Sequence, residues 1–205
     1  MTVILLIRHG TNDYIQSGRL PGRLPDIHLN DEGRKQAEVV AQYVTQFPIT
    51  AIFSSPLERA METAKLISDK LHLETKPRDD LIEVDCGIWQ GRRISSLRRL
   101  KLWNEVQHFP SRFCFPGGES FLQAQYRICQ GLEGLARDSK PNDVIACITH
   151  ADPIRLAVAY YLGLSLDLIQ RICISPASLT VLSLDRACAR LLMLNYEFSF
   201  RLPKT

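Results

Sequence analysis

The chain has 205 residues, of which 45% are apolar and 23% are charged. This composition is typical of a single globular domain with a buried core, and it excludes a disordered chain, a collagen-like repeat and a coiled coil as the main architecture. The formal net charge of +3 indicates a mild preference for anionic partners, and it is too small to predict nucleic-acid binding by itself.

The amino terminus carries a short apolar run at residues 3–7 that does not resemble a secretion signal. No basic region precedes it, and no cleavage site of small residues follows it. No stretch of the chain approaches the roughly 20 apolar residues that a membrane-spanning helix needs. We therefore expect a cytoplasmic protein with no membrane partner.

The six cysteines lie 15 to 28 residues apart, which excludes a CxxC pair and the spacing of a zinc site. Most of them have apolar neighbours, as Cys147 does. We expect buried free thiols, which suit a reducing compartment. No metal site and no other cofactor is predicted.

The first half of the chain alternates buried strands with amphipathic helices. Residues 3–7 form a continuous apolar run, which predicts a buried strand. Residues 30–47 predict a helix with Asn30 as its N-cap. A short strand is expected at 51–54. The next helix is expected from Ser55, since Ser-Pro-Leu-Glu has the form of a capping box with proline at its first position.

The second half of the chain continues the alternation. A helix is expected near Ser120, and residues 144–149 form another apolar run that predicts a buried strand. A helix capped by Asp152 and Pro153 is expected to follow, up to residue 162. A closing strand pair is expected at 179–184 and 190–194. Alternating strands and helices predict an α/β fold, a three-layer α/β/α sandwich with a mainly parallel mixed sheet.

Ligands of such folds bind beyond the carboxyl ends of the strands. The predicted strands are followed by Arg8 and His9, by a helix start containing Arg59, and by His150. Arginine matches the geometry of phosphate oxygens, and histidine can act as a nucleophile or donor. A segment with Glu83 adds a candidate acid–base group. Each residue alone has an ordinary structural interpretation, whereas together and in this order they indicate a phosphate site.

At this point the sequence resembles the histidine phosphatase superfamily, also called the phosphoglycerate mutase-like superfamily. The resemblance runs through most of the chain and in the family's order. It is carried by Leu-Ile-Arg-His-Gly at 6–10, the helix start at 29–37, Ser-Ser-Pro-Leu-Glu-Arg-Ala at 54–60, the Glu83 segment, Pro-Gly-Gly-Glu-Ser at 116–120 and Thr-His at 149–150.

The resemblance implies a metal-independent phosphomonoester hydrolase acting on a small phosphorylated metabolite. His9 would be the nucleophile that becomes phosphohistidine. Arg8, Arg59 and a protonated His150 would hold the phosphoryl oxygens, and Glu83 would be the general acid. The nearby cations stabilise the Glu83 carboxylate, so either burial or the arriving phosphate dianion must raise its pKa. We favour the dianion, and we expect Glu83 to activate water in the second step.

The loop after His9 departs from the family's pattern. The family often has a hydroxyl residue three positions after the nucleophile and an asparagine six positions after it, where this chain has Asn12 and Ile15. Asn12 is expected to donate to phosphate in place of the hydroxyl. Ile15 cannot donate, but Gln16 is adjacent. Arg23 is a candidate contact for a second anionic group of the substrate, or an ordinary loop charge.

Residues 92–120, which we call the lid segment, are expected to cover the site within a single domain of residues 1–205. The segment is short, and Glu83 is followed by Val84 where mutases of the family usually have arginine, so the sequence resembles the phosphatase branch. Five basic residues stand near its start: Arg92, Arg93, Arg98, Arg99 and Lys101. They form either a solvated face or an attractive surface for a polyanion.

Three alternatives remain at the level of sequence. One is a phosphoglycerate-type phosphomutase, and another is a non-catalytic phospholigand-binding protein on the same fold. The third is a nucleic-acid-binding module that uses the basic residues, and nucleic acid is an unlikely partner on this sequence. The identity of the phosphomonoester is open. A homodimer is a further candidate, with residues 196–202 as an extra strand or an interface.

Overall fold

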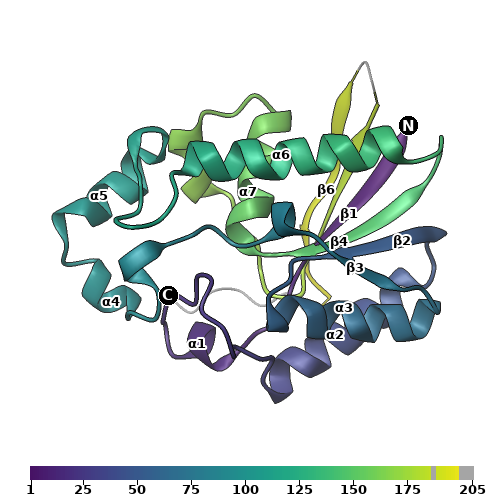
Figure 1. Ribbon diagram of the computed structural model, residues 1–205, viewed down its shortest axis with the longest axis horizontal. Helices are drawn as coiled ribbons and strands as arrows, with labels where there is room; N and C mark the ends of the chain where they lie inside the picture. The colour runs from purple at the N-terminus through teal and green to yellow at the C-terminus, as the bar shows by residue number, and fades with distance from the viewer. Residues whose placement is uncertain (186–187, 199–205) are drawn as a thin grey trace.

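The computed structural model describes residues 1–185 and 188–198, and the strands of this part form one mixed sheet (Figure 1). The strands are β1 (Thr2–Arg8), β2 (Ile49–Ser54), β3 (Thr75–Pro77), β4 (Val144–Thr149), β5 (Leu179–Leu184) and β6 (Ala189–Tyr196). Their order in the sheet is β3-β2-β4-β1-β5-β6. The strands from β3 to β1 pair in parallel, and β5 and β6 are antiparallel. The predicted mixed, mainly parallel sheet is confirmed.

Helices cover both faces of the sheet. The α-helices are α1 (Asp13–Gln16), α2 (Asp31–Val44), α3 (Glu58–Leu71), α4 (Ile94–Leu97), α5 (Lys101–His108), α6 (Phe121–Asp138) and α7 (Ala151–Tyr161). Successive residues of β1 point to opposite faces: Leu5 and Ile7 pack with α2 and α3, whereas Ile4 and Leu6 pack with α6 and α7. Two buried apolar cores on one sheet confirm the three-layer sandwich.

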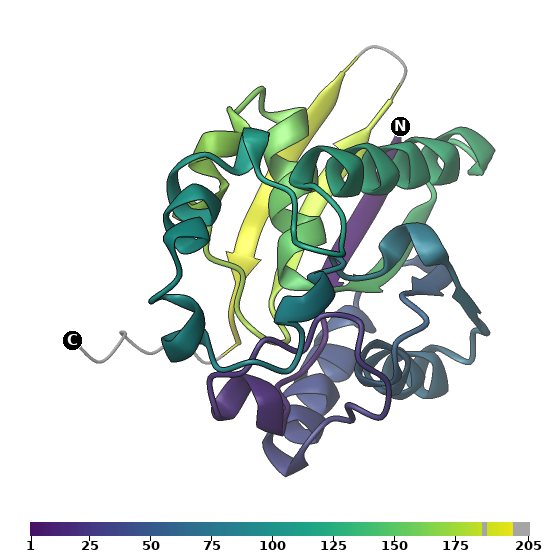
Figure 2. The ribbon, with the colours of Figure 1, turned by 60° about the vertical axis from the view of Figure 1, so that its left-hand side comes forward.

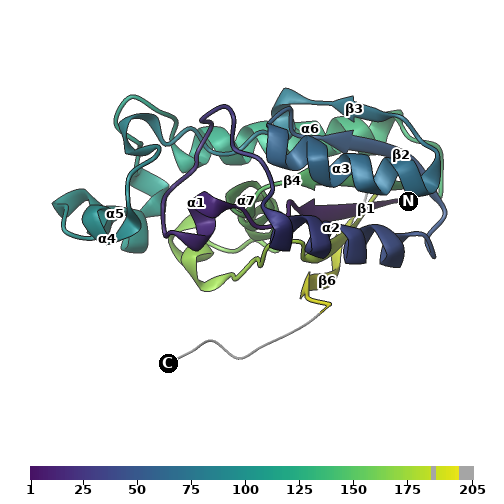
Figure 3. The ribbon, with the colours of Figure 1, turned by 90° about the horizontal axis from the view of Figure 1, so that it is seen from below.

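The lid segment lies at one end of the molecule in all three ribbon views, beyond the carboxyl end of β1 (Figures 2 and 3). It carries α4 and α5. Buried aromatic rings join it to the main core, with Trp89 packing against both Phe113 and Phe115. The loop between α1 and α2 pairs with the start of the lid segment through an antiparallel bridge between Arg19 and Arg93. The lid segment is therefore packed on the domain.

Two of the predicted helix starts are confirmed. Asn30 caps α2 by accepting the backbone N–H of Gly33 at 2.9 Å. Ser120 and Gln123 form a reciprocal capping box at the start of α6. Both caps stand directly before the first helical residue, so the apolar stripe of each helix begins within its first two turns.

Two other predicted helix starts are wrong. The helix expected from Ser55 begins at Glu58, with Leu57 at the N-cap position. The Ser55 hydroxyl accepts the Leu57 N–H at 3.4 Å and also contacts His150, at 2.7 Å from its Nε2 atom. The helix expected to be capped by Asp152 begins at Ala151, with His150 at the N-cap position, two residues before the expected cap. The residues at the two expected capping positions, Ser55 and Asp152, both act on residues of the candidate site described below: Ser55 contacts His150, and Asp152 affects Glu83.

Four short elements had no clear signal in the sequence: β3, α1, α4 and α5. None of them is longer than 8 residues, and short segments carry little periodicity. There are also 3-10 turns at Asp79–Leu81, Gly87–Trp89, Pro110–Arg112 and Leu166–Arg171.

The prediction that the cysteines are buried is only half right. Cys86, Cys129 and Cys147 are buried, whereas Cys114, Cys173 and Cys188 are exposed. The exposed thiols lie in loops or beside the β5–β6 turn, where neighbouring apolar letters do not imply burial.

No helix in residues 1–185 and 188–198 is long and apolar enough to cross a membrane. Of the carboxyl-terminal residues predicted as an extra strand or interface, Tyr196 ends β6, and 199–202 lie outside the described residues.

Candidate active site

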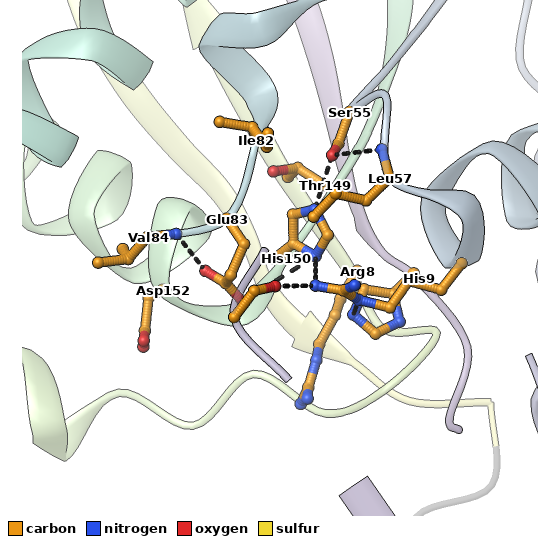
Figure 4. A network of polar contacts seen from close by, with 12 residues as sticks. Arg8, His9, Ser55, Leu57, Ile82, Glu83, Val84, Thr149, His150 and Asp152 are labelled. Atoms are coloured by element: carbon orange, nitrogen blue, oxygen red, sulfur yellow. Dashed lines mark hydrogen bonds and ion pairs between the residues drawn. The ribbon is translucent and has the colours of Figure 1, made fainter. Parts of the chain in front are cut away.

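The parallel pairing of β1, β2 and β4 brings three segments of the candidate site to one edge of the sheet. The His9 backbone N–H donates to the Thr149 carbonyl at 3.0 Å, and the Ser55 N–H donates to the Ile148 carbonyl at 2.9 Å. Figure 4 shows the side chains of His9, Glu83 and His150 side by side at this edge. The sheet-edge rule used on the sequence therefore predicts the location of the site.

His9 is held as a neutral imidazole with one defined tautomer. Its ring is 2% exposed, and Nδ1 donates to the Gly10 carbonyl at 2.6 Å. Nε2 therefore carries the lone pair, and it accepts from Arg59 Nε at 3.2 Å. Burial, together with the charges of Arg59 and Arg8, holds the pKa of His9 well below its usual range. A neutral Nε2 is the form that a nucleophile requires.

Three buried donors around His9 have no hydrogen-bond partner among the described residues: Arg8 Nε, Asn12 Nδ2 and Arg59 Nη1. Arg59 is fully buried at the start of α3, and its Nη2 donates to the Gly22 carbonyl at 2.7 Å. Burial lowers the pKa of Arg8 to about 10, so its guanidinium stays charged at neutral pH. Unpartnered buried donors are costly, and a tetrahedral anion would satisfy them.

His150 completes the cationic wall but is neutral before a ligand binds. Its Nε2 lies 2.7 Å from Ser55 Oγ, and its Nδ1 lies 3.3 Å from Arg59 Nη2. The guanidinium can only donate, so Nδ1 accepts and Nε2 carries the proton. Burial, together with Arg59 and the other neighbours, holds the pKa of His150 well below its usual range. The protonated His150 expected from the sequence therefore requires the charge of a bound phosphate.

Glu83 is a carboxyl group whose pKa is raised into the neutral range. Burial, followed by the negative charge of Asp152, raises its pKa to about 7, against the opposing effects of the Val84 N–H, Arg59 and Arg8. Its Oε1 accepts from the Val84 N–H at 2.9 Å, and its Oε2 lies 3.9 Å from His150 Nδ1. The pKa of Glu83 is therefore raised before substrate binds. Burial is the largest cause, whereas from the sequence alone we favour the charge of the substrate.

This raised pKa predicts that Glu83→Gln stabilises the protein above pH 7. In the unfolded chain Glu83 ionises near its ordinary pKa of 4.5, but in the folded protein only near about 7. Its favourable contribution to folding is therefore complete below pH 4.5 and is lost as pH rises to 7. Glutamine has no such loss, so the variant should gain about 1–3 kcal/mol at pH 8, or about 2–4 °C per kcal/mol. Thermal melts at pH 5 and pH 8 measure the difference, and an equal effect at both pH values would contradict it.

The remaining predicted substrate contacts, Gln16, Asn12 and Arg23, have different surroundings. Gln16 is exposed at the end of α1. Asn12 caps α1 by accepting the Ile15 N–H at 2.9 Å, while its Nδ2 stays unpartnered within the described residues. The Arg23 guanidinium already donates to the Glu83 carbonyl at 2.7 Å and to Glu119 at 2.7 Å. Substrate contacts by Gln16 and Arg23 remain predictions.

Sequence reasoning missed several residues of the site. Ser55 fixes the His150 ring, and Thr63 Oγ1 accepts the Gly10 N–H at 3.2 Å. Asp152 raises the pKa of Glu83. One sequence signal pointed to Thr63: it lies four residues after Arg59 and therefore on the same face of the helix. The contacts of Ser55 and Asp152 join distant parts of the chain, so spacing does not predict them.

The basic residues of the lid segment, from Arg92 to Lys101, are all exposed. Their predicted attraction for a polyanion therefore has the required access to solvent. In the described part of the chain no group of three or more His, Cys, Asp or Glu side chains could hold a metal ion.

Comparisons with known proteins agree with this geometry. The family model of the histidine phosphatase superfamily (branch 1) matches residues 4–197. Phosphoserine phosphatase 1 of Hydrogenobacter thermophilus is 30% identical over 200 residues, which cover 95% of this chain and 92% of that protein. The 2,3-bisphosphoglycerate-dependent phosphoglycerate mutase of Thermoplasma acidophilum is 28% identical over 195 residues, covering 90% and 88%. The structure of a mycobacterial glucosyl-3-phosphoglycerate phosphatase superimposes with a TM-score of 0.86 at 25% identity, covering 94% and 98%.

Proposed function

Because this chain belongs to the histidine phosphatase superfamily and is a phosphatase of that superfamily, we propose that it hydrolyses a small phosphomonoester through a phosphohistidine on His9. The observation that carries the proposal is the neutral Nε2 of His9, buried beside donors from Arg8, Asn12 and Arg59 that lack partners among the described residues. A phosphoryl group placed there would satisfy these donors and meet the nucleophile. This mechanism uses no metal ion.

In the first step, His9 Nε2 attacks phosphorus, and the bond from phosphorus to the leaving oxygen breaks. The protonated Glu83 carboxyl gives its proton to that oxygen, so the product leaves as an alcohol. Arg8 and Arg59 hold the equatorial oxygens, where charge accumulates in the transition state. The phosphate dianion also favours protonation of His150, which then donates from Nδ1.

In the second step, the Glu83 carboxylate takes a proton from water, and the resulting hydroxide attacks phosphorus. The bond from phosphorus to His9 Nε2 breaks, inorganic phosphate leaves, and Glu83 is protonated again. One group thus serves as acid and then as base, which requires a pKa near the working pH. The value of about 7 for Glu83 supports this double role.

For the substrate class, we propose a small phosphomonoester that also carries a carboxylate. The names of the phosphoserine and glucosyl-3-phosphoglycerate phosphatases support this class. We also propose that residues 1–205 are one domain, whose lid segment (92–120) contacts the part of the substrate beyond the phosphate. A cytoplasmic location and a homodimer remain proposals. A homodimer formed by pairing of two β6 edge strands is disfavoured, because the pairing of β6 with β5 has two register shifts and such irregular edges hinder pairing with the edge of a second sheet.

We expect phosphate release from phosphoserine, 3-phosphoglycerate and p-nitrophenyl phosphate that is unchanged by EDTA. The chemistry uses only side chains, so removing divalent metal should not change kcat. The measurement is phosphate release with and without the chelator, across this panel. Loss of turnover in EDTA that returns with a divalent metal would overturn the proposal. Conversion of 3-phosphoglycerate to 2-phosphoglycerate with 2,3-bisphosphoglycerate and without phosphate release would identify a mutase instead.

A further inference from the structure

The acid residue Glu83 lies on an irregular segment between the turn at Asp79–Leu81 and the turn at Gly87–Trp89. A segment of this kind is not fixed by a helix or a strand ladder, yet a general acid must be placed within hydrogen-bond reach of the leaving oxygen. Something else must therefore hold its backbone.

Two arginines from distant parts of the chain hold this backbone by its carbonyl groups. Arg127 Nη1, on α6, donates to the carbonyls of Asp80 at 3.0 Å and Ile82 at 2.9 Å. Arg23 Nε, from the loop before α2, donates to the carbonyl of Glu83 itself at 2.7 Å. The carbonyls of Asp80, Ile82 and Glu83 thus point to guanidinium groups, while that of Leu81 accepts from Thr149 Oγ1 at 2.6 Å. These contacts fix the direction in which the Glu83 side chain leaves the segment.

One carboxylate oxygen joins the two arginines. Glu119 Oε1 accepts from Arg23 Nη2 at 2.7 Å, from Arg127 Nη2 at 2.8 Å and from the Asp85 N–H at 2.9 Å. The Glu119 side chain is only 16% exposed. Charge-assisted hydrogen bonds at low exposure are strong and directional. Removing the carboxylate would leave two guanidinium groups close together, with only Asp85, 3.9 Å from Arg23 Nη1, as a remaining acidic partner of this pair.

The same loop also reaches the phosphate-binding side. Gly22, next to Arg23, accepts from Arg59 Nη2 through its carbonyl at 2.7 Å. Adjacent residues therefore bind the guanidinium proposed to hold phosphate and the backbone of the proposed acid. The distance between the phosphoryl group and the Glu83 carboxyl depends on this connection.

We propose that Glu119, with Arg23 and Arg127, is a positioning residue that aims the Glu83 carboxyl at the leaving oxygen. This inference rests on the proposed function, in which Glu83 is the general acid. Glu119 does not touch substrate in this proposal. Loss of Glu119 should slow only reactions whose leaving group needs a proton. A residue that only stabilised the fold would affect all substrates equally.

The experiment compares kcat/KM for two substrates, because kcat/KM reports the steps up to release of the leaving group. Phosphoserine has an alkoxide leaving group that needs a proton, whereas p-nitrophenyl phosphate has a leaving group that departs without one. Glu119→Gln and Arg127→Lys should each lower kcat/KM for phosphoserine about ten- to a hundredfold, the order expected for misplacement of a catalytic group. For p-nitrophenyl phosphate both should stay close to the wild-type value.

A matched control is Arg78→Lys. Arg78 is also a partly buried arginine paired with a carboxylate, Asp80, and its side chain is 32% exposed against 21% for Arg127. It lies next to the acid segment, but among the described residues its side chain donates to the Asp80 carboxylate and not to the Glu83 backbone. The control should change both substrates equally or not at all. Equal loss on both substrates in Glu119→Gln would overturn the proposal, even with a lower melting temperature, since that is the result of a purely structural role.

A double variant separates this inference from the proposed function. Once Glu83→Gln has removed the acid, Glu119→Gln should cause no further selective loss, because nothing remains to be positioned. A further selective loss in the double variant would overturn the positioning role. If Glu83→Gln alone shows no selectivity between the two substrates, the assignment of Glu83 as the acid fails, and the positioning role fails with it. Selectivity in Glu83→Gln that is absent from Glu119→Gln overturns only the positioning role.

Discussion

Replacing His9 by alanine is expected to abolish phosphate release from every phosphomonoester. The variant loses the only atom proposed to bond to phosphorus, and removing a catalytic nucleophile costs about 10⁴-fold or more in kcat. Binding of inorganic phosphate should survive, because Arg8, Arg59 and Asn12 keep their donors. Phosphate release and phosphate-binding calorimetry, measured on the same preparation, check the two halves of this expectation.

A second histidine provides the control for this variant. His28 is 54% exposed and paired with Glu62 at 2.6 Å, and it contacts none of the described residues proposed to act on phosphate, so His28→Ala should keep full activity. Wild-type enzyme is mixed with substrate labelled in its phosphoryl group and quenched in alkali. The protein should then carry the label as phosphohistidine, whereas His9→Ala should carry none. Turnover by His9→Ala comparable to wild type, or label that persists in it, would refute His9 as the nucleophile.

The layers of the fold follow from signals that are local in the sequence. The apolar runs at 3–7 and 144–149 became β1 and β4 almost unchanged, since a strand buried on both faces reads as a continuous apolar run. The sequence predicts Asn30 as a cap and a helix start near Ser120, and each side chain accepts from a backbone N–H three residues further along the chain. Sheet-edge geometry then predicts that His9, Arg59 and His150 meet.

The chemistry of the site depends on contacts between distant residues, which local patterns do not contain. Ser55 had every feature of an N-cap, yet its hydroxyl binds a histidine 95 residues away. The pKa of Glu83 depends on burial and on Asp152, neither of which spacing predicts. Arg23 was a candidate for substrate, and its observed partners are Glu83 and Glu119. In each case the side chain makes a contact with a residue distant in the sequence, where the sequence alone favours a contact with neighbouring residues, with solvent or with substrate.

The site also keeps polar groups in a state that folding alone would not favour. Arg59 is buried and Arg8 is partly buried, each with a buried donor atom that lacks a partner among the described residues, and Glu83 is a largely buried carboxyl whose pKa is raised to about 7. Such groups oppose stability unless a ligand satisfies them. Phosphate or vanadate should therefore raise the melting temperature, as any ligand that binds only the folded state does. The same unsatisfied donors make the site ready for a phosphoryl group.

Glu83→Gln should be the variant that most clearly separates acid catalysis from phosphate binding. Without a proton donor, kcat/KM for phosphoserine should fall about 10²- to 10⁴-fold. For p-nitrophenyl phosphate kcat/KM should hardly change. Water activation is lost as well, so kcat for p-nitrophenyl phosphate should fall and the phosphoenzyme should accumulate. A burst of one p-nitrophenolate per active site, followed by slow turnover, is the expected trace.

The pH profile of the same variant tests the assignment of the proton. In the wild type, kcat/KM for phosphoserine should decline as pH rises through about 7, because the protonated carboxyl of Glu83 is the active form in the free enzyme. His9 and His150 have lowered pKa values and Arg8 titrates near 10, so these groups do not produce that limb. Glu83→Gln should lack the decline. A decline near pH 7 that persists in the variant would assign the proton to another group, and full activity with a flat profile would remove Glu83 from the mechanism.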